Sequence, residues 1–574
     1  MARTKDSFTP WDFLDEYRGK DFYGNWPTVS EMFDITAKRY PDNMCFRVFV
    51  PKEYSLTYKE AQANINKISS YLINDGVKPG DKIAVSGKNS PEWATAYLSV
   101  LKAGAIIVPL DISYNDEDML KLLTFGDVSR IFIDGDRIEK LDPKNTLNLK
   151  RYSLEEGSKH PYIFDLSAPS CSPERTATED DVAAILFTSG TTGTPKGVML
   201  THKNLVSDCY QAQSNMNIYP TDIFYAILPI HHAYTMLAVF IEAISVGAGI
   251  VFGKRLVVSQ LLKELKQGKV TMFLAVPMLF NKIIASLMAG VRKKGVIVYG
   301  LIRFMMGFSG FVKKVFGVNI GKKLFGFLLR QVSLETNRIC ISGGGPLPPS
   351  TFKQFNELGI DFVQGYGLTE TSPITHLNPI YAYEETSVGK NCAGVEAKIV
   401  NPDSDGNGLI YLRGSMIMKG YYKNEEATKE IIADDGFLNT GDVGHIDSRG
   451  YLYLTGRAKN VIVTEGGKNV FPEEIEDHFQ LYNEVDQICI VGYYAKEGSM
   501  GESIKAIIYP AKAYSSSVTK EVMKARFDQI IEEVNKELQS YKKITKIALS
   551  DTELPMTSTK KIKRFEVIKM FKDK

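Results

Sequence analysis

The chain has 574 residues, of which 24% are charged and 44% are hydrophobic. This length exceeds what one hydrophobic core supports, so we expect two or more domains, and the ordinary composition excludes collagen-like, coiled-coil and wholly disordered proteins. The 69 Lys and Arg residues nearly balance the 67 Asp and Glu residues, and the net charge of +2 does not indicate a nucleic-acid-binding protein.

The cysteines and the first residues favour a reduced protein of the cytoplasm. The 6 cysteines lie far apart without a Cys-x-x-Cys pair, so neither a disulfide framework nor a zinc site is expected. The first twenty or so residues lack the apolar core of a signal peptide. No uninterrupted apolar run reaches the length of a bilayer span, since the closest, from Val296 to Val312, contains Arg303.

The first part of the chain alternates between predicted strands and helices. Apolar strands are expected at 82–87, 105–111 and 130–134. A helix over 93–102 is predicted between the first two, because Ser90 and Pro91 form a helix start and Gly104 ends the pattern. This β-α-β order predicts a parallel sheet covered by helices.

The next segments continue this alternation to about residue 380. A strand at 182–187 feeds a glycine-rich loop, and a helix begins near Thr201. Beyond 380 come shorter strands, and the last part reads as a helix at 472–479, a strand at 488–493 and a helix at 520–538. We therefore predict an α/β fold with a large N-terminal domain of layered sheets and helices, residues 1–456, and a small α+β C-terminal domain, residues 457–574, joined at 456–460.

The loop from Thr188 to Gly197, TSGTTGTPKG, carries the strongest functional signal. Its small residues let backbone N–H groups converge on an anion, and Lys196 adds a positive charge, which together suit a polyphosphate. It is not a Walker loop, because Pro195 interrupts that pattern and no Gly-Lys-Ser/Thr triplet follows. The alternative is a flexible Thr/Gly linker, but linkers rarely follow a buried strand directly and end in Pro-Lys-Gly.

Further candidate residues lie in short polar segments, each of which would be structural if it stood alone. Glu370 in QGYGLTET is suited to hold a divalent cation against phosphate oxygens, and Tyr366 to lie against a nucleobase. Asp442 in LNTGDVGHID is expected on a glycine-flanked turn, where its carboxylate would accept ribose hydroxyls. The pair His231-His232 follows a predicted strand, and a structural role and a functional role are equally expected for it. The terminal LPMTSTKKIKR, taken alone, is expected to be a solvated basic tail.

Taken in order, these segments resemble the adenylate-forming superfamily, which contains acyl-CoA synthetases, luciferases and peptide-synthetase adenylation domains. The most specific matches are TSGTTGTPKG, GYGLTET, the TGD at 440–442 and GRAKNVIVTEGGKNVFPEEIE at 456–476. Within the superfamily the chain is most similar to long-chain acyl-CoA synthetases, in ISGGGPL at 341–347, in the GRAKN joint and in the terminal motif. There Lys560 stands where many relatives have Gly, and Lys561 is identified as the catalytic lysine by its distance from Pro555 and from the Ile-Lys-Arg that follows.

The resemblance implies a two-step reaction that uses Mg²⁺, ATP and coenzyme A. A fatty carboxylate would attack the α-phosphorus of ATP to give acyl-adenylate and pyrophosphate, and the thiol of coenzyme A would then release AMP. No protein nucleophile is needed, so catalysis would rest on positioning and charge neutralisation. A medium-chain or aryl-acid CoA ligase would share the nucleotide residues, and a catalytically dead nucleotide- or lipid-binding relative is the alternative from another class.

The resemblance also assigns roles to individual residues. Lys561, Lys196 and His232 would be catalytic, with His232 near the carboxylate, and Thr188 and Glu370 would lie at the metal. Lys459 would be the hinge about which the C-terminal domain rotates, and Gly466, Gly467 and Lys468 would line the path of coenzyme A. The ATP-binding set would comprise Thr188, Ser189, Gly190, Thr191, Thr192, Gly193, Thr194, Lys196, Gly343, Gly344, Gly345, Gly365, Tyr366, Gly367, Thr369, Asp442, Arg457 and Lys561.

One stretch has an unusual charge distribution. No Asp or Glu occurs from Leu265 to Leu334, while many Lys and Arg residues alternate with Phe and Met between Val291 and Arg330. We expect this stretch to make peripheral contact with anionic lipid at the cytoplasmic face of a membrane, against the alternative of a core helix pair with solvated lysines. The family also contains homodimers, and the sequence leaves that state open.

Overall fold

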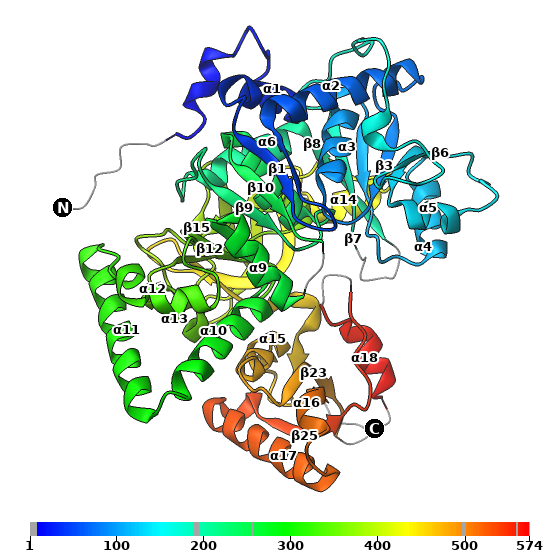
Figure 1. The fold of residues 1–574 in the computed structure, drawn as a ribbon. Helices are drawn as coiled ribbons and strands as arrows, with labels where there is room; N and C mark the ends of the chain where they lie inside the picture. The colour runs from blue at the N-terminus through cyan, green and yellow to red at the C-terminus, as the bar shows by residue number, and fades with distance from the viewer. Residues whose placement is uncertain (1–8, 189–194, 255–256, 496–500, 558–560, 573–574) are drawn as a thin grey trace. The chain divides into compact units, whose positions relative to one another are not determined.

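The computed structural model describes residues 9–188, 195–254, 257–495, 501–557 and 561–572, which form two compact units (Figure 1). Unit 1 comprises Met1–Gly345, Phe352–Ala397 and Leu412–Leu438. Unit 2 comprises Pro346–Thr351, Lys398–Tyr411 and Asn439–Lys574. The mixture of strands and helices confirms the predicted α/β class, whereas the boundary at 456/457 stays a prediction.

The larger sheet of unit 1 is parallel through its centre, from β13 to β1. Its strands in spatial order are β15 (Lys390–Asn391), β14 (His376–Leu377), β13 (Asp361–Tyr366), β12 (Ile339–Ser342), β11 (Met272–Ala275), β9 (Ile223–Ala226), β10 (Gly249–Phe252), β1 (Met44–Val48) and β2 (Tyr54–Thr57).

The other sheet of unit 1 contains the predicted β-α-β strands. Its strands in spatial order are β18 (Gly420–Tyr421), β8 (Lys196–Thr201), β7 (Val182–Thr188), β4 (Ile106–Pro109), β3 (Lys82–Ser86), β5 (Val128–Ile133) and β6 (Lys150–Ser153). From β7 to β6 neighbouring strands run parallel, as predicted, while β18, β8 and β7 pair antiparallel.

Helices cover both sheets and fill the space between them. The helices of this part are α1 (Val29–Arg39), α2 (Tyr58–Asn74), α3 (Pro91–Lys102), α4 (Asp116–Phe125), α5 (Gly135–Leu141), α6 (His202–Gln213), α7 (Ala233–Thr235), α8 (Glu242–Val246), α9 (Val258–Gly268), α10 (Pro277–Arg292), α11 (Val296–Phe316), α12 (Gly321–Gln331), α13 (Pro349–Glu357) and α14 (Glu425–Ile431).

Helix α3 shows how the sequence places an element between the sheets. The Ser90 hydroxyl accepts the backbone N–H of Trp93 at 3.1 Å and Pro91 occupies the first turn, as the sequence predicts. The helix contacts β3 and β4 on one side and β1 on the other, and it is buried from Pro91 to Leu101. A helix that is apolar all round is expected in such a position.

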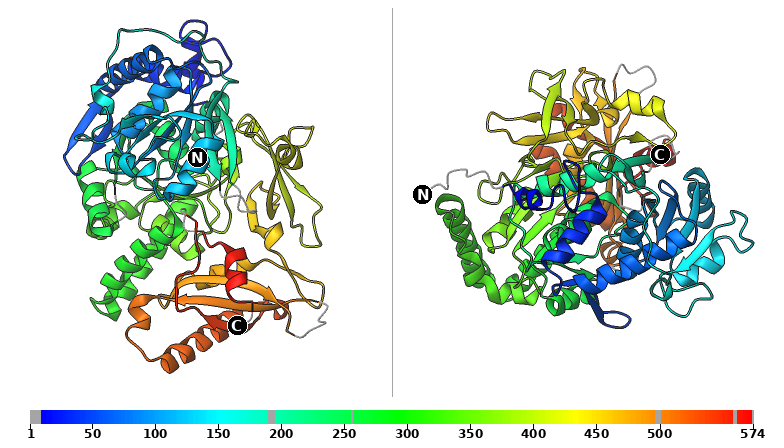
Figure 2. Two further views of the ribbon diagram at one scale, coloured as in Figure 1. Left: turned by 90° about the vertical axis from the view of Figure 1, so that its right-hand side faces the viewer. Right: turned by 90° about the horizontal axis from the view of Figure 1, so that it is seen from above.

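Unit 2 contains a small sheet, a hairpin and a C-terminal sheet with its helices (Figure 2). The strands and helices are β16 (Glu396–Val400), β17 (Gly408–Arg413), β19 (Leu438–Ile446), β20 (Leu452–Arg457), β21 (Ile462–Val463), β22 (Asn469–Val470), β23 (Val485–Tyr493), β24 (Ser503–Pro510), β25 (Ile544–Leu549), α15 (Pro472–Glu476), α16 (Lys512–Ser515), α17 (Lys520–Glu537) and α18 (Arg564–Met570).

The C-terminal sheet has a hydrophobic core on each face. On β24, Ile504, Ala506 and Ile508 belong to the core that includes residues of α15 and α17, and the alternate residues Ile507 and Tyr509 belong to the core with α18. This alternation is the two-residue period of a strand covered on both sides. The predicted helix at 472–479 is shorter than expected, since α15 ends at Glu476 and a single 3-10 turn follows.

Helix α11 departs from the sequence-based expectation about membrane spans. Among the residues that the structure describes, it is the one helix long and apolar enough to cross a membrane by length and composition, and 22% of its most apolar window is buried in the protein. An uninterrupted apolar run is too strict a criterion for such a helix, because a helix can carry a charge such as Arg303 on one face.

Candidate functional site

Several predicted site residues of unit 1 lie at one edge of the larger sheet. His231-His232 follow β9, Gly343–Gly345 follow β12, and Tyr366 is the last residue of β13. β9, β11, β12 and β13 are parallel neighbours, so their carboxyl ends lie at the same edge. Ligands of open α/β sheets bind at such edges. The fold therefore gathers these distant segments where a ligand site is expected.

Lys196 and Glu370 are connected through Tyr421, a residue that the sequence analysis missed. Tyr421 lies on β18 opposite Val198 of β8. Its ring centroid is 4.6 Å from Lys196 Nζ, and its hydroxyl donates a 2.8 Å hydrogen bond to Glu370 Oε1. Burial, and then the charge of Glu370, raise the pKa of Tyr421, so the hydroxyl remains a donor. The structure thus brings a cation and a carboxylate of the predicted site together.

The strands that flank the predicted phosphate loop pair directly with each other. Thr188, the last residue of β7, is opposite Lys196, the first residue of β8, and its hydroxyl donates to the Lys196 carbonyl at 3.5 Å. The predicted site residues between them, Ser189, Gly190, Thr191, Thr192, Gly193 and Thr194, lie outside the described residues, as does Lys560.

The glycine cluster after β12 packs against Tyr234, which the sequence analysis also missed. A Cβ atom on Gly343 would be 3.0 Å from the Tyr234 ring, so a side chain does not fit unless the ring moves. The Tyr234 hydroxyl donates to the Ile341 carbonyl at 3.1 Å and fixes that ring. Gly344 has a φ of +80°, a conformation that favours glycine, and Gly345 continues the loop. Tyr234 follows His232 by two residues, and that proximity was the available signal.

The segment around Tyr366 is tightly constrained. A Cβ atom on Gly367 would collide with the Pro373 carbonyl, and one on Gly365 would be 3.2 Å from the His376 carbonyl oxygen. The Tyr366 ring centroid is 5.9 Å from that of His376. Burial lowers the pKa of His376 to about 3, so Tyr366 has a neutral aromatic neighbour at physiological pH. Thr369 and Glu370 begin the short 3-10 helix Thr369–Thr371 that follows.

The pair His231-His232 contacts a residue that follows a strand of the other sheet of unit 1. His231 Nε2 is 3.5 Å from Asp111 Oδ2, and the His231 and His232 ring centroids are 4.1 Å apart. Burial raises the pKa of Asp111, but the nearby His231 imidazole and the hydrogen bond from the Ser113 N–H outweigh it and leave that pKa below its usual range. Asp111 follows β4. An ionised carboxylate therefore faces the His231 imidazole, whose ring is tilted by 55° against that of His232.

Asn89 fixes the backbone that leads to this pair. Its amide nitrogen donates to the carbonyls of Ala226 and Leu228 at 2.9 and 2.8 Å, and its amide oxygen accepts the Ile230 N–H at 3.0 Å. Three bonds nearly exhaust what one amide side chain can make, so Asn89 defines the path of the chain from β9 to His231. No motif in the sequence indicated this role.

The structure also shows which side chains of unit 1 offer metal ligands. Within the described residues, Asp111, His231 and His232 place ligand atoms within 4.8 Å of one another. Nitrogen-rich sets of this kind suit transition metals, whereas Mg²⁺ prefers oxygen donors. The predicted magnesium residues Thr188 and Glu370 offer a hydroxyl and a carboxylate, and these are donors of the type that Mg²⁺ requires.

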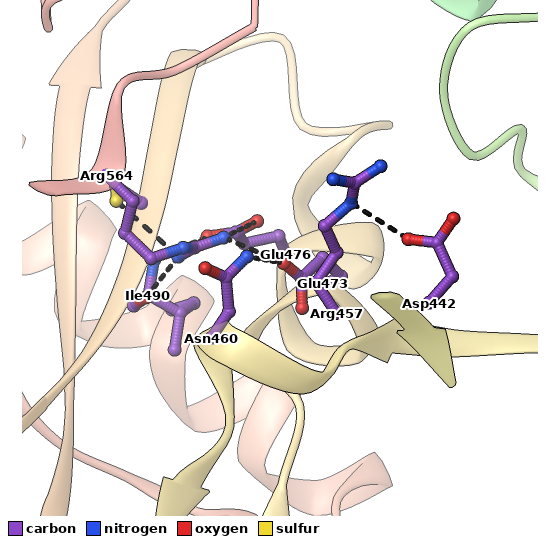
Figure 3. Close-up of polar contacts among 8 residues, drawn as sticks. Asp442, Arg457, Asn460, Glu473, Glu476, Ile490 and Arg564 are labelled. Atoms are coloured by element: carbon purple, nitrogen blue, oxygen red, sulfur yellow. Dashed lines mark hydrogen bonds and ion pairs between the residues drawn. The ribbon is translucent and has the colours of Figure 1, made fainter. Parts of the chain in front are cut away.

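In unit 2, Asp442 and Arg457 form an ion pair across two strands (Figure 3). Asp442 lies on β19 opposite Arg457 on β20, and Arg457 Nε is 2.8 Å from Asp442 Oδ1. The expectation that Asp442 lies on a turn was wrong, because the antiparallel pairing continues through it. The preceding Gly441 adopts a φ of +70° within the strand, and the Thr440 hydroxyl accepts the Asp442 N–H at 3.1 Å.

The terminal lysine motif is anchored to the segment that follows the predicted joint. Arg564 forms two hydrogen bonds with Glu476, at 2.7 and 3.0 Å, and lies 3.4 Å from Glu473 (Figure 3). Glu473 also accepts a 2.5 Å hydrogen bond from Asn460. Hydrogen bonds and ion pairs within unit 2 therefore join two of the segments that carry the family resemblance, 456–476 and 554–564.

Lys561 is exposed beside this anchor. Its backbone N–H donates to the Thr557 hydroxyl at 3.1 Å, and its carbonyl accepts the Thr557 N–H at 2.8 Å. These two bonds link Lys561, three residues before Arg564, to Thr557. The backbone of the predicted catalytic lysine is thus fixed while its side chain reaches solvent.

The predicted hinge and coenzyme A residues also lie in unit 2. Gly466, Gly467 and Lys468 form the turn between β21 and β22, closed by the Gly467 N–H, which donates to the Thr464 carbonyl at 2.8 Å. Nothing lies within 4 Å of a Cβ built on either glycine, so the turn is exposed. Lys459 lies in the single 3-10 turn Ala458–Asn460, and burial together with the Arg457 charge lowers its pKa.

Comparison with known proteins agrees with the motifs and the fold. Residues 33–422 match the family model of the AMP-binding enzymes, and residues 459–574 match that of the AMP-binding enzyme C-terminal domain. The chain is 26% identical to a long-chain-fatty-acid–CoA ligase of Bacillus subtilis, with 94% of this chain and 93% of that protein covered. It is 27% identical to 4-coumarate–CoA ligase CCL1 of Humulus lupulus, with 98% of each covered.

The fold also matches solved structures. One is the o-succinylbenzoate coenzyme A synthetase MenE of Bacillus subtilis in complex with ATP and magnesium ion. The match has a TM-score of 0.74 at 22% sequence identity and covers 93% of this chain and 98% of that chain.

Proposed function

Because the chain belongs to the family of AMP-binding enzymes, we propose that it is an AMP-forming acid–CoA ligase whose acid is a fatty acid, in particular a long-chain one. In the first step a carboxylate oxygen attacks the α-phosphorus of ATP, and pyrophosphate leaves. In the second step the thiol of coenzyme A attacks the acyl carbon of the acyl-adenylate, and AMP leaves. Activation is needed because a carboxylate is a poor electrophile, whereas AMP is a good leaving group.

The arrangement of Lys196, Tyr421 and Glu370 is the observation that carries this proposal. Lys196 at the end of the phosphate loop, Glu370 of the GYGLTET segment and Tyr421 on β18 are far apart in sequence, yet one hydrogen bond and one cation–π contact join them. A flexible linker is not expected to keep its lysine, Lys196, connected through Tyr421 to Glu370 of another glycine-rich segment. A polyphosphate site needs both a cation for the phosphate oxygens and a carboxylate for the accompanying metal.

The remaining nucleotide roles follow from the positions of the predicted residues. The 188–197 loop holds the β- and γ-phosphates, Gly343–Gly345 and Tyr366 flank adenine, and Thr369 contacts the α-phosphate. The glycine at 344 supports the adenine assignment, because nothing lies within 4 Å of a Cβ built there and the backbone is open to the approach of a flat ring.

Magnesium fits the residues that the proposal assigns to it. Glu370 offers a carboxylate and Thr188 a hydroxyl, both hard oxygen donors, and Mg²⁺ takes few protein ligands when phosphates supply the others. When bound, the ion would neutralise the charge of the phosphate oxygens. Tyr421 holds the Glu370 carboxylate in one orientation through its 2.8 Å hydrogen bond.

Unit 2 supplies the residues that complete the reaction. The Asp442 carboxylate accepts hydrogen bonds from the ribose hydroxyls, and Arg457 holds that carboxylate in place. Lys561 bridges the carboxylate of the acid substrate and the α-phosphate of ATP. The C-terminal domain then turns about Lys459, which withdraws Lys561 and presents Gly466, Gly467 and Lys468 to coenzyme A. Such alternation is a hinge motion between two poses, one for each step. The exposure of Lys561 and of the 466–468 turn supports these assignments.

His232 lies near the acyl carboxylate in this account. The chain of contacts from Asp111 through His231 to His232, with Asn89 fixing the backbone, provides a rigid support for that imidazole. His232 then orients the carboxylate or acts as a gate to the acyl pocket, as the family resemblance implies.

The similarity to a long-chain-fatty-acid–CoA ligase supports the fatty acid as substrate, while the similarity to a 4-coumarate–CoA ligase makes an aromatic acid the second candidate. A pyrophosphate-release assay over fatty acids of 4 to about 18 carbons and aromatic acids, with and without coenzyme A, separates them. We expect the highest kcat/KM with long-chain acids. A maximum with cinnamic-type acids would favour the second candidate, and no release with any acid would indicate a catalytically dead relative.

A further inference from the structure

Helix α11 carries a continuous apolar stripe that the protein leaves exposed. Ile297, Phe304 and Phe311 are 88%, 74% and 57% exposed. With Leu301, Phe308 and Val315 they recur every three or four residues, which places all six on one face of the helix along its length of about 30 Å. Single exposed apolar residues are common, but an extended stripe of this kind marks an interaction surface.

The opposite face of α11 carries the polar contacts. Lys313 is buried and donates 2.7 Å hydrogen bonds to Asn356 and Asp361, and Arg303 is 3.7 Å from Glu357. Ser309 is buried on the same side. Ile302 and Met306 are buried on this inner face as well, so α11 is apolar on both faces. Helices at a water surface instead carry charged residues on the outer face, and an outer stripe that is apolar throughout fits a medium that is less polar than water.

Basic residues flank the stripe at both ends. Arg292, Lys293 and Lys294 are exposed just before α11, and Lys314 lies in its last turn, where its Nζ is 3.4 Å from a carboxylate oxygen of Glu385. Helix α12, which contacts α11, adds exposed Lys323 and Arg330 together with the exposed apolar Leu324 and Phe327. The absence of Asp and Glu from Leu265 to Leu334 leaves these charges without acidic neighbours on the same segment.

We infer that the outer face of α11, with Leu324 and Phe327 of α12, inserts into one leaflet of an anionic lipid bilayer, with α11 parallel to the membrane plane. The apolar stripe would enter the acyl region and the flanking Lys and Arg side chains would contact lipid phosphates. Figures 1 and 2 show α11 and α12 at the margin of unit 1, where such contact meets no strand of its sheets. This inference goes beyond the proposed chemistry and does not depend on it.

An orientation parallel to the membrane follows from the inner contacts. If α11 crossed the bilayer, Lys313 and Arg303 would have to leave Asp361 and Glu357, because these partners belong to the folded body of unit 1. An in-plane helix keeps both ion pairs and still buries the whole stripe. Amphipathic helices with basic flanks adopt this position at bilayer interfaces.

Co-sedimentation of the full chain with vesicles tests the inference. Wild type should bind phosphatidylcholine–phosphatidylglycerol vesicles, and the triple change Phe304→Gln, Phe308→Gln and Phe311→Gln should lower the partition coefficient by about tenfold or more. The exposed triple Tyr23→Gln, Leu481→Gln and Val522→Gln is the matched control and should bind as wild type does. Changing Lys293, Lys294, Lys323 and Arg330 to Gln should weaken binding to anionic vesicles about tenfold, with little effect on pure phosphatidylcholine.

A depth measurement separates an in-plane from a spanning helix. Fluorophores attached after Ile297→Cys, Phe304→Cys or Phe311→Cys should be quenched to a similar extent by the same shallow nitroxide lipid. Clearly different depths at the three positions would overturn the in-plane orientation. Unchanged vesicle binding by the Phe triple variant would overturn the inference as a whole.

The remaining outcomes concern a second copy and the enzyme reaction. The stripe is a protein interface, and the inference fails, if three results occur together. Wild type sediments as a dimer without lipid, the Phe triple variant sediments as a monomer, and neither protein binds vesicles.

Pyrophosphate release from a water-soluble acid such as octanoate should be unchanged in the Phe triple variant. A wild type that binds vesicles but activates no acid would contradict the proposed function and leave the membrane inference supported.

Discussion

Tyr421 shows how a single side chain can join two motifs of a site. Its hydroxyl holds Glu370 and its ring faces Lys196, so it sets the distance between the carboxylate and the cation of the proposed phosphate site. A carboxylate that is held by a hydrogen bond before the substrate binds needs less reorganisation when the charge of the phosphates arrives.

We predict that Tyr421→Phe lowers kcat/KM for ATP by about tenfold or more, because a hydrogen bond to a charged group contributes about 1.5–3 kcal/mol. The ring and its contact with Lys196 remain in this variant. The neighbouring Tyr422→Phe is the control, since Tyr422 donates to Asp127 on an exposed surface. Steady-state kinetics with ATP as the varied substrate measures the effect, and equal losses in both variants would argue against a specific role.

Lys561 allows the two half-reactions to be separated. Lys561→Ala should abolish acyl-adenylate formation, because the ammonium that bridges carboxylate and phosphate is lost, while thioester formation from supplied acyl-adenylate is retained. Lys569→Ala, an exposed lysine on α18, should leave both steps unchanged. Single-turnover assays of each step provide the measurement. Comparable losses in the two steps would contradict the assigned role.

At this scale the sequence predicts residues within motifs but not their partners. Lys196, Glu370 and Asp442 could be chosen from local patterns of Gly, Ser and Thr. Tyr421 and Asn89 could not, because their roles depend on contacts with residues far away in the chain, and the one local signal for Tyr234 was its proximity to His232. Asp442 was expected in a turn because Gly441 precedes it, and only the pairing with Arg457 shows that the strand continues.

At the scale of elements, the segment from α7 to α8 combines the histidine support with an irregular helix. Met236–Ile241 forms a π-helical turn, a feature that is frequent near functional sites, and Glu242 begins α8. Glu242 is buried, and this burial raises its pKa to about 8, although the Cys209 and Gln213 side chains oppose the shift. The carboxyl group is therefore largely protonated in the folded enzyme at neutral pH.

This shift predicts a pH-dependent stability. The folded-state pKa of Glu242 lies above its unfolded value near 4.5, so its contribution is full below pH 4.5 and is lost as the pH rises through 8. Glu242→Gln should remove that loss, which amounts to at most about 1.4 kcal/mol per pH unit. Urea unfolding at pH 5.5 and pH 8 should show the variant gaining stability relative to wild type at the higher pH.

The exposed Glu426→Gln on α14 serves as the control and should follow wild type at both pH values. A Glu242→Gln variant whose stability relative to wild type is the same at pH 5.5 and pH 8 would show that Glu242 is ionised in the folded state.

Elements were predicted best where hydrophobic periodicity and helix caps coincide. The helix at 93–102 begins at Pro91 after the Ser90 cap, and the strand at 182–187 extends by one residue to Thr188. Helix α11 was noticed as a basic, apolar stretch, but the sequence did not reveal that its polar residues face the protein. That orientation depends on Asp361, Asn356 and Glu357, which follow α11 by several tens of residues.

At the scale of the whole molecule, the proposal requires the C-terminal domain to serve both half-reactions. The relevant residues of unit 2 lie on separate features. Lys561 is bonded to Thr557 and lies three residues before Arg564, and Gly466–Lys468 form the turn between β21 and β22. Two such features can act on one substrate in succession only if the domain changes pose between the steps.

We predict that Lys459→Pro slows the second half-reaction far more than the first, because proline fixes φ at the proposed hinge. Adenylation should stay within about threefold of wild type, and thioester formation from acyl-adenylate should fall by about a hundredfold. Lys459→Ala, which removes the side chain but not the backbone freedom, should retain both steps. Stopped-flow assays of each step decide, and a Pro variant with an unimpaired second step would place the hinge elsewhere.

Transfer of an oxygen atom from the carboxylate to AMP is the most specific signature of the proposed reaction. With a fatty acid labelled with ¹⁸O in its carboxylate, attack on the α-phosphorus and later cleavage of the acyl C–O bond by the coenzyme A thiol should leave one ¹⁸O atom in each AMP. Mass spectrometry of the nucleotide products measures this transfer. Adenylation followed by thioester formation gives singly labelled AMP and unlabelled pyrophosphate. Unlabelled AMP, or ADP with labelled inorganic phosphate, would rule out this reaction.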